Sequence, residues 1–81
     1  MTTNAPSNLA TLYVVPDCPL CAEVRQWLQQ MKLEYVERDV AGDFGALRAM
    51  YKLTHQRLVP VLEIGGRALV RPTAEALANL L

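Results

Sequence analysis

The chain has 81 residues and a mass of 9.0 kDa, which suffices for one small hydrophobic core and not for two. Hydrophobic residues make up 52% of it and charged residues 20%, which is typical of a folded globular protein and not of a disordered chain. Eight basic and eight acidic side chains cancel, so no net field attracts nucleic acid. The apolar runs are far shorter than the roughly 20 residues of a membrane span, which excludes membrane insertion.

The N-terminal segment lacks the basic and long apolar regions of a secretory signal. We therefore expect a flexible tail over residues 1–8, a single domain over residues 9–81 and a cytoplasmic location. We also expect a monomer that binds neither nucleic acid nor membrane.

The first half of the chain predicts a strand, a helix and a second strand. The apolar run Leu9–Val15 is typical of a buried strand. Apolar residues at helical spacing over Pro19–Met31 predict a helix that has Pro19 in its first turn, and Cys18 then lies at or next to the N-cap. Glu34–Val40 alternates imperfectly and predicts a short, half-exposed strand.

A second helix is predicted from about Asp43 to Lys52. Asp43 is a good N-cap residue. Four apolar residues are spaced to bury one stripe of this helix; they are Phe44, Leu47, Met50 and Tyr51.

The last third of the chain predicts a hairpin and a short helix. Pro60–Ile64 and Arg67–Val70 are rich in β-forming residues, and Gly65-Gly66 between them is a two-residue hairpin signal. Thr73 can cap a final helix, whose expected buried face consists of Ala74, Leu77, Ala78 and Leu81.

The predicted order is therefore β-α-β-α-β-β-α. A right-handed crossover makes the first two strands parallel, and the hairpin completes a four-stranded mixed sheet with three flanking helices. This is an α/β, thioredoxin-like fold.

Two cysteines, Cys18 and Cys21, stand where the first strand gives way to its helix. Unpaired N–H groups and the positive end of the helix dipole stabilise a thiolate at such a position and lower its pKa. Cys21 follows three residues later on the first turn, so it can displace whatever Cys18 captures and close an intramolecular disulfide. The pattern indicates a reversible dithiol switch.

A Cys-x-x-Cys pair can also be half of a metal site. Zinc needs four ligands, and the sequence adds only His55 to the two cysteines. The alternative function is therefore a thioredoxin-fold binding module in which the pair ligates a metal or an iron–sulfur cluster, completed by a second chain or by glutathione.

Over residues 10–81 the sequence resembles a glutaredoxin or a glutaredoxin-like redoxin. The resemblance rests on Thr11–Tyr13 running into Pro16–Cys21, on Val59-Pro60 and on Ile64–Arg67. The segment Cys18–Cys21 is similar to the family's C-P-Y-C motif, with Leu20 in place of the tyrosine, and Leu58–Pro60 is similar to its T-V-P segment.

The resemblance implies a thiol-disulfide oxidoreductase that reduces protein or glutathione mixed disulfides. Cys18 and Cys21 would be catalytic, with no bound cofactor or metal. Pro60 would be cis and face the cysteines, and the backbone of Val59 would pair with an extended substrate peptide or with glutathione. Leu20 would line the substrate site. Arg57 matches a basic position that precedes T-V-P in the family.

The sequence departs from glutathione-binding relatives before its last helix. Val70-Arg71 and Thr73 replace a Gly-Gly pair and an acidic residue, and the Thr73 hydroxyl is the remaining candidate for holding a carboxylate. Arg71-Pro72 also resembles redoxins that take electrons from thioredoxin reductase. The reductant is therefore left open between glutathione and a thioredoxin reductase-type donor.

Three further side chains admit a simple interpretation beside a functional one. Arg25 could favour a thiolate, but a solvated surface charge is the simpler expectation. His55 could carry protons, although we expect a solvated loop residue. Trp27 lies within the apolar stripe of its helix and is expected in the core.

Overall fold

The computed structural model of the protein describes residues 9–80. The expected tail at residues 1–8 and the expected core residue Leu81 lie outside this range. The elements are β1 (Ala10–Val14), α1 (Pro19–Gln30), β2 (Tyr35–Asp39), α2 (Phe44–Thr54), β3 (Val61–Ile64), β4 (Arg67–Val70) and α3 (Ala74–Leu80). The predicted order is confirmed, and the predicted boundaries agree with the observed ones to within two residues.

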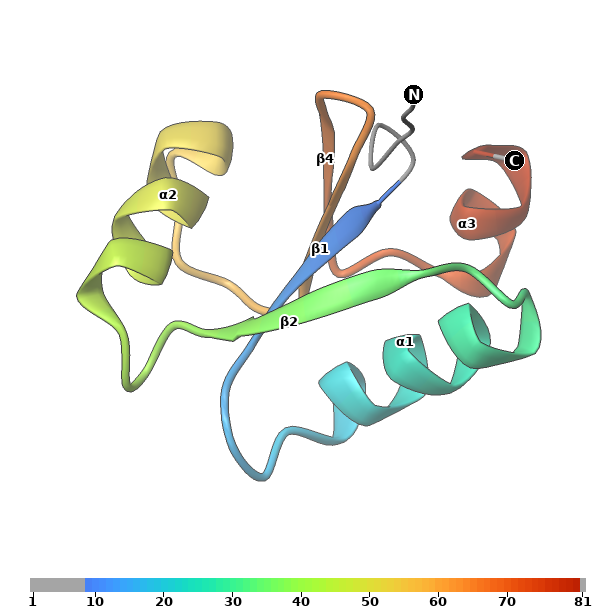
Figure 1. The fold of residues 1–81 in the computed structure, drawn as a ribbon, viewed down its shortest axis with the longest axis horizontal. Coiled ribbons are helices and arrows are strands. Elements are labelled where there is room, and N and C mark those ends of the chain that lie inside the picture. Colours follow the sequence, from blue (N-terminus) through green and yellow to red (C-terminus); the bar gives the residue numbers. More distant parts are fainter. Residues whose placement is uncertain (1–8, 81) are drawn as a thin grey trace, which may run out of the picture.

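The four strands form one mixed sheet in the order β2-β1-β3-β4. β1 pairs parallel with β2 and antiparallel with β3, and β3 pairs antiparallel with β4. α2 covers one face of the sheet, and α1 and α3 cover the other (Figure 1). The protein therefore has the predicted thioredoxin-like fold.

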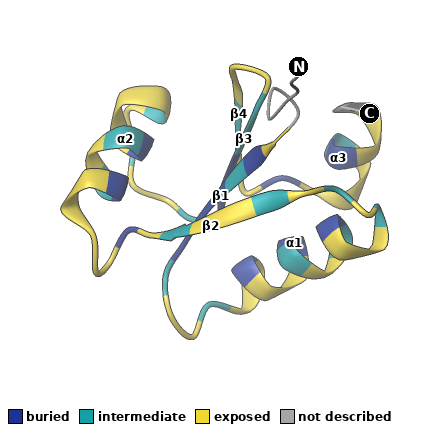
Figure 2. Cartoon of the chain, in the orientation of Figure 1, coloured by how far each residue is buried: buried dark blue, intermediate teal, exposed yellow. Residues whose placement is uncertain are grey.

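The core consists of two clusters, one on each face of the sheet. Alternation along β1 sends Leu12 into the cluster with α1 and α3, and Tyr13 into the cluster with α2. β3 contributes in the same way through Leu62 and Val61. In Figure 2 the buried positions of α1 and α2 accordingly lie on the sides that face the sheet.

Local sequence signals account for the start of α2 and for the hairpin. The Asp43 carboxylate caps α2 by accepting hydrogen bonds from the N–H groups of Gly45 at 2.9 Å and Ala46 at 3.3 Å. Gly65 and Gly66 both have positive φ, at 59° and 82°, as a tight turn between twisted strands requires.

The predicted buried stripe of α2 is partly wrong. Met50 is fully buried, but Phe44 is 83% exposed and Tyr51 47% exposed. The helix packs through Ala46 and Met50, which are four residues apart. Phe44 precedes Ala46 by two residues, about 200° around the helix, and therefore points away from the sheet.

The predicted face of α3 is also only partly correct. Thr73 caps the helix by accepting a hydrogen bond from the Ala76 N–H at 3.0 Å. Leu77 is 1% exposed and belongs to the core, whereas Ala74 and Ala78 are exposed. α3 is a short helix that contacts the core mainly through one large side chain, so the small alanines on either side stay in solvent.

The helices are short. α1, with 12 residues, is the longest of them. Between residues 9 and 80, no helix combines the length and hydropathy that crossing a membrane requires.

We predict that Met50→Ala lowers the free energy of unfolding by about 2–5 kcal/mol, because it empties a fully buried site. Phe44→Ala removes a larger side chain from the same helix but should change this free energy by less than about 0.5 kcal/mol, because the ring lies in solvent. Chemical denaturation of both variants measures the difference. The opposite ranking would show that the packed face of α2 is assigned wrongly.

Candidate active site

The connection from β1 to α1 places Cys18 at a helix N-terminus. Asp17 has a positive φ of 55° and turns the chain after Pro16, which matches the turn-forming role that Asp residues often have. Cys18 is then extended, with φ −113° and ψ 105°, and is the N-cap of α1. Its carbonyl accepts the first helical hydrogen bond, from Ala22, at 3.0 Å.

Cys18 and Cys21 form a disulfide across the first turn of α1, with their Cα atoms 5.2 Å apart. The N–H of Cys21 donates a hydrogen bond to the Cys18 sulfur at 3.1 Å. Pro19 has no N–H, so few backbone donors of this turn can reach the N-cap side chain. The N–H of Cys21 is one of them, and it points at the Cys18 sulfur. In the reduced protein the same N–H is placed to stabilise a Cys18 thiolate.

The two sulfurs have different surroundings. Cys18 is partly exposed, whereas Cys21 is 1% exposed and packs in the core with Val24 and Leu28. Of the two cysteines, only Cys18 is therefore accessible to a substrate, and Cys21 is enclosed by core residues.

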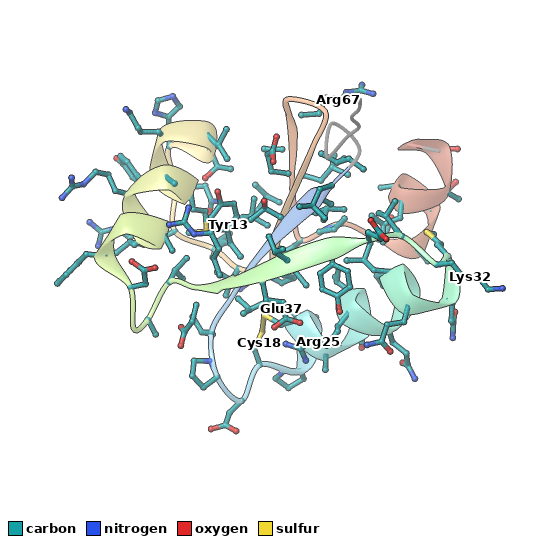
Figure 3. The ribbon with its side chains drawn as sticks, viewed as in Figure 1. Tyr13, Cys18, Arg25, Lys32, Glu37 and Arg67 are labelled. Carbon is teal, nitrogen blue, oxygen red and sulfur yellow. A yellow bond between two sulfur atoms is a disulfide. The ribbon has the colours of Figure 1, made fainter. Side chains whose placement is uncertain are left out.

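Arg25 is engaged elsewhere. Its guanidinium forms a bidentate pair with Glu37 of β2, at 2.5 Å from Nε and 3.0 Å from the terminal nitrogen (Figure 3). The hydrogen bond to Glu37 raises the pKa of Arg25, so this group stays charged. Arg25 is thus neither the thiolate partner nor the free surface charge that its sequence position suggested; it ties α1 to the edge strand.

The Val59-Pro60 peptide bond is cis, and Pro60 is buried at the start of β3. Pro60 borders a small cavity of about 30 Å³ together with Leu20 and Val24, which flank Cys21 on α1. Glu23, Trp27, Arg71 and Pro72 complete its lining. The structure therefore brings Pro60 to one cavity with Leu20, which lies between the two cysteines in the sequence; both residues were predicted for the substrate site.

Arg71 holds the loop that contains Pro60. Its backbone N–H donates to the Pro60 carbonyl at 2.7 Å, and its side-chain Nε donates to the Val59 carbonyl at 2.8 Å. Of the main-chain groups predicted to pair with substrate, the Val59 carbonyl is thus already occupied.

Two other predicted site residues lie apart from this cavity. Arg57 is exposed and lines a larger, open hollow of about 250 Å³ against α2; the other residues there are Phe44, Leu47, Arg48, Tyr51 and Lys52. Thr73 is exposed, and its hydroxyl caps α3.

Sequence reasoning missed the positions of Trp27, Glu23 and Arg71 around the cavity. Trp27 is only partly buried and packs against the edge of the core, so one side of the ring reaches the cavity. No sequence signal pointed to the conformation of Arg71, because a residue before a proline ordinarily has an extended backbone, whereas the φ of Arg71 is 49°.

The described residues offer little for a metal. Between residues 9 and 80 there is no group of three or more His, Cys, Asp or Glu side chains placed to hold an ion. His55 ends α2 in a left-handed conformation with φ 55°, and its N–H donates to the Tyr51 carbonyl.

We predict that, in the reduced and folded protein, iodoacetamide modifies Cys18 and spares Cys21, because Cys18 is partly exposed and Cys21 is buried. A short labelling pulse followed by peptide mass spectrometry measures both sites, and labelling in denaturant is the control in which both react. Equal modification of the two cysteines in the folded protein would contradict the observed burial.

Comparison with known proteins agrees with this geometry. The family model described as Glutaredoxin matches residues 10–69. An uncharacterized glutaredoxin-like 8.6 kDa protein in the rubredoxin operon of Clostridium pasteurianum is 32% identical over 59 residues, which cover 73% of this chain and 79% of the relative.

Solved structures are similar over most of the chain. The thioredoxin-like protein BC3987 aligns with a TM-score of 0.83 and 29% identity, covering 89% of this chain and 99% of that one. The glutaredoxin of Archaeoglobus fulgidus shares the fold, with a TM-score of 0.81 at 15% identity and coverage of 98% and 95%. A buckwheat glutaredoxin–glutathione complex shares it at 0.68 and 21% identity, with coverage of 90% and 67%. With its Cys18–Cys21 pair at the start of α1 in a thioredoxin-like fold, this chain belongs to the glutaredoxin family of redox proteins.

Proposed function

We propose that the protein is a thiol-disulfide oxidoreductase that reduces protein or glutathione mixed disulfides through Cys18 and Cys21. The observation that carries this proposal is the asymmetry of the pair: a partly exposed N-cap cysteine is joined to a buried cysteine across a single helical turn. An exposed sulfur can attack, and a buried neighbour is protected from reaction with anything except that sulfur.

In the first step the reduced protein attacks a substrate disulfide. The Cys18 thiolate forms a bond to one substrate sulfur, and the substrate S–S bond breaks. The other half of the substrate leaves as a thiolate and takes up a proton. The product is a mixed disulfide between Cys18 and the substrate; the Cys18 sulfur is now at the disulfide level, the departing substrate sulfur is reduced to a thiol, and the number of disulfide bonds is unchanged.

In the second step Cys21 loses its proton and attacks the Cys18 sulfur. The mixed disulfide breaks, and the second substrate half leaves as a thiol. The protein is oxidised by two electrons to the Cys18–Cys21 disulfide, and the substrate is reduced to two thiols. The Cα separation of 5.2 Å lies within the range of protein disulfides, so this step needs no large movement of α1.

Positioning of the substrate falls to the neighbouring loop. The backbone of Val59, next to the cis Pro60, pairs with an extended substrate chain, and Leu20, which lines the same cavity as Pro60, contacts that chain. Arg57 and Thr73 lie farther out and contact the flanks of the substrate, where a basic group or a hydroxyl holds a carboxylate.

The partners follow from this chemistry. Disulfide-bearing proteins are the substrates, and glutathione or a thioredoxin reductase-type donor returns two electrons to the pair, which needs a reducing compartment such as the cytoplasm. The complex of the buckwheat relative with glutathione supports the first donor. The domain over residues 9–81 carries the whole activity as a monomer.

We expect Cys18→Ser to reduce disulfide-reducing activity to background, because the attacking sulfur is gone. Cys21→Ser should retain the attack and accumulate the mixed disulfide, because the second displacement cannot occur. Mass spectrometry detects the trapped species as an added substrate half. Ala22→Ser, on the exposed side of the same turn, is the matched control and should behave as the parent.

Full disulfide-reducing activity in metal-free Cys18→Ser would contradict the proposal. Recycling assays then identify the donor. Turnover with glutathione and glutathione reductase is compared with turnover on thioredoxin reductase, each with the parent and with Cys21→Ser.

A further inference from the structure

Arg71 has an unusual backbone and two contacts to one loop. Its φ of 49° is in the left-handed region, which costs a non-glycine residue roughly 1 kcal/mol or more. From this position its N–H reaches the Pro60 carbonyl and its Nε reaches the Val59 carbonyl. A strained residue is therefore kept where it ties the end of β4 to the chain beside the cysteines.

The hydrogen bond from the Arg71 side chain occupies one of the two main-chain groups of Val59 that a substrate strand would use. In antiparallel pairing, two opposed residues exchange both of their main-chain hydrogen bonds, so Val59 would both donate to and accept from a substrate strand. The Val59 carbonyl is taken by Arg71 at 2.8 Å. A substrate that makes both bonds must displace the guanidinium.

The position of the Arg71 guanidinium allows it to move away from the Val59 carbonyl. Arg71 is exposed, and its side chain borders the cavity shared with Leu20 and Pro60. Glu23 is the one acid in the lining of that cavity, and within residues 9–80 it forms no ion pair with Arg71. The positive group is thus available to a new anionic partner on the side where a substrate would enter.

Neutral and acidic substrate strands differ in the partner that they offer to the Arg71 guanidinium once it has left the Val59 carbonyl. A neutral substrate strand replaces the bond from Arg71 to Val59 with a similar bond and leaves the guanidinium to water. A strand that carries a carboxylate gives the guanidinium a charged, bidentate partner in return. The exchange is therefore favourable mainly for acidic segments.

We propose that Arg71 is a specificity-determining residue, which covers the Val59 carbonyl in the free protein and yields to disulfide segments with a carboxylate next to the reacting cysteine. This inference rests on the proposed function. The carboxylate can come from an Asp or Glu of a protein segment or from glutathione, and Arg71 itself takes no part in bond making or electron transfer.

The test uses the reduced protein and single-turnover oxidation of Cys18 and Cys21 by excess disulfide, followed by acid quench and thiol labelling. The substrates are two peptide disulfides that differ only in a Glu or a Gln beside the cysteine, together with glutathione disulfide and hydroxyethyl disulfide. Arg71→Asn removes the guanidinium but tolerates the left-handed backbone. Arg67→Asn removes the same charge at the hairpin, far from Cys18 in Figure 3.

We expect the parent to react about fivefold faster with the Glu peptide than with the Gln peptide, the upper range for an exposed ion pair. In Arg71→Asn this ratio should fall to about one, with hydroxyethyl disulfide unaffected, because that molecule is too short to pair with Val59. Arg67→Asn should keep the parent ratio. A loss seen with the peptides identifies a protein carboxylate, and a loss confined to glutathione disulfide identifies the tripeptide.

An Arg71→Asn variant that keeps the parent peptide ratio and also the parent rate with glutathione disulfide, or an equal fall in Arg67→Asn, would overturn the assignment of Arg71 while leaving the oxidoreductase intact. If the parent were not oxidised by hydroxyethyl disulfide at all, the proposed function would fail and the inference with it.

Discussion

The burial of Cys21 is the constraint on which the site depends. Its side chain packs with Val24 and Leu28 against the central strands, so the first turn of α1 has one rotational setting relative to the sheet. Cys18, three residues earlier, is then held at the N-cap as a partly exposed residue. One packed thiol therefore determines both which sulfur faces solvent and where it stands relative to the helix N–H groups.

The sheet brings the second part of the site to the same place. β3 runs antiparallel to β1, with Val61 opposite Tyr13. Pro60 precedes Val61 by one residue and so lies near the end of β1, from which the chain turns through Asp17 to Cys18. A loop that is about forty residues away in sequence meets the cysteines because two central strands are paired in this register.

Patterns confined to a short stretch of chain were readable from the sequence. The strand-to-helix junction at Cys18, the cap at Asp43 and the turn at Gly65-Gly66 each depend on neighbouring residues only, and the structure confirms them. The resemblance to glutaredoxins likewise implied the cis bond before Pro60, which the structure contains.

Features that depend on contacts between distant segments were not readable. The face on which α2 packs is set by how closely Ala46 approaches the sheet, and a count of apolar positions placed Phe44 wrongly in the core. Arg25 pairs with Glu37, and Arg71 donates a hydrogen bond to the Val59 carbonyl; in each case the partners are 12 residues apart in the sequence. Long polar side chains can reach many acceptors, so their partners follow only from the assembled fold.

The proposed attack by Cys18 requires its sulfur to be anionic at neutral pH in the reduced protein. The most direct measurement is the rate of Cys18 alkylation in the reduced protein as a function of pH, with Cys21→Ser used to isolate the signal. The account predicts a rate that is already near its plateau at pH 7. A rate that still rises steeply through about pH 8.5, as for an unperturbed thiol, would contradict it.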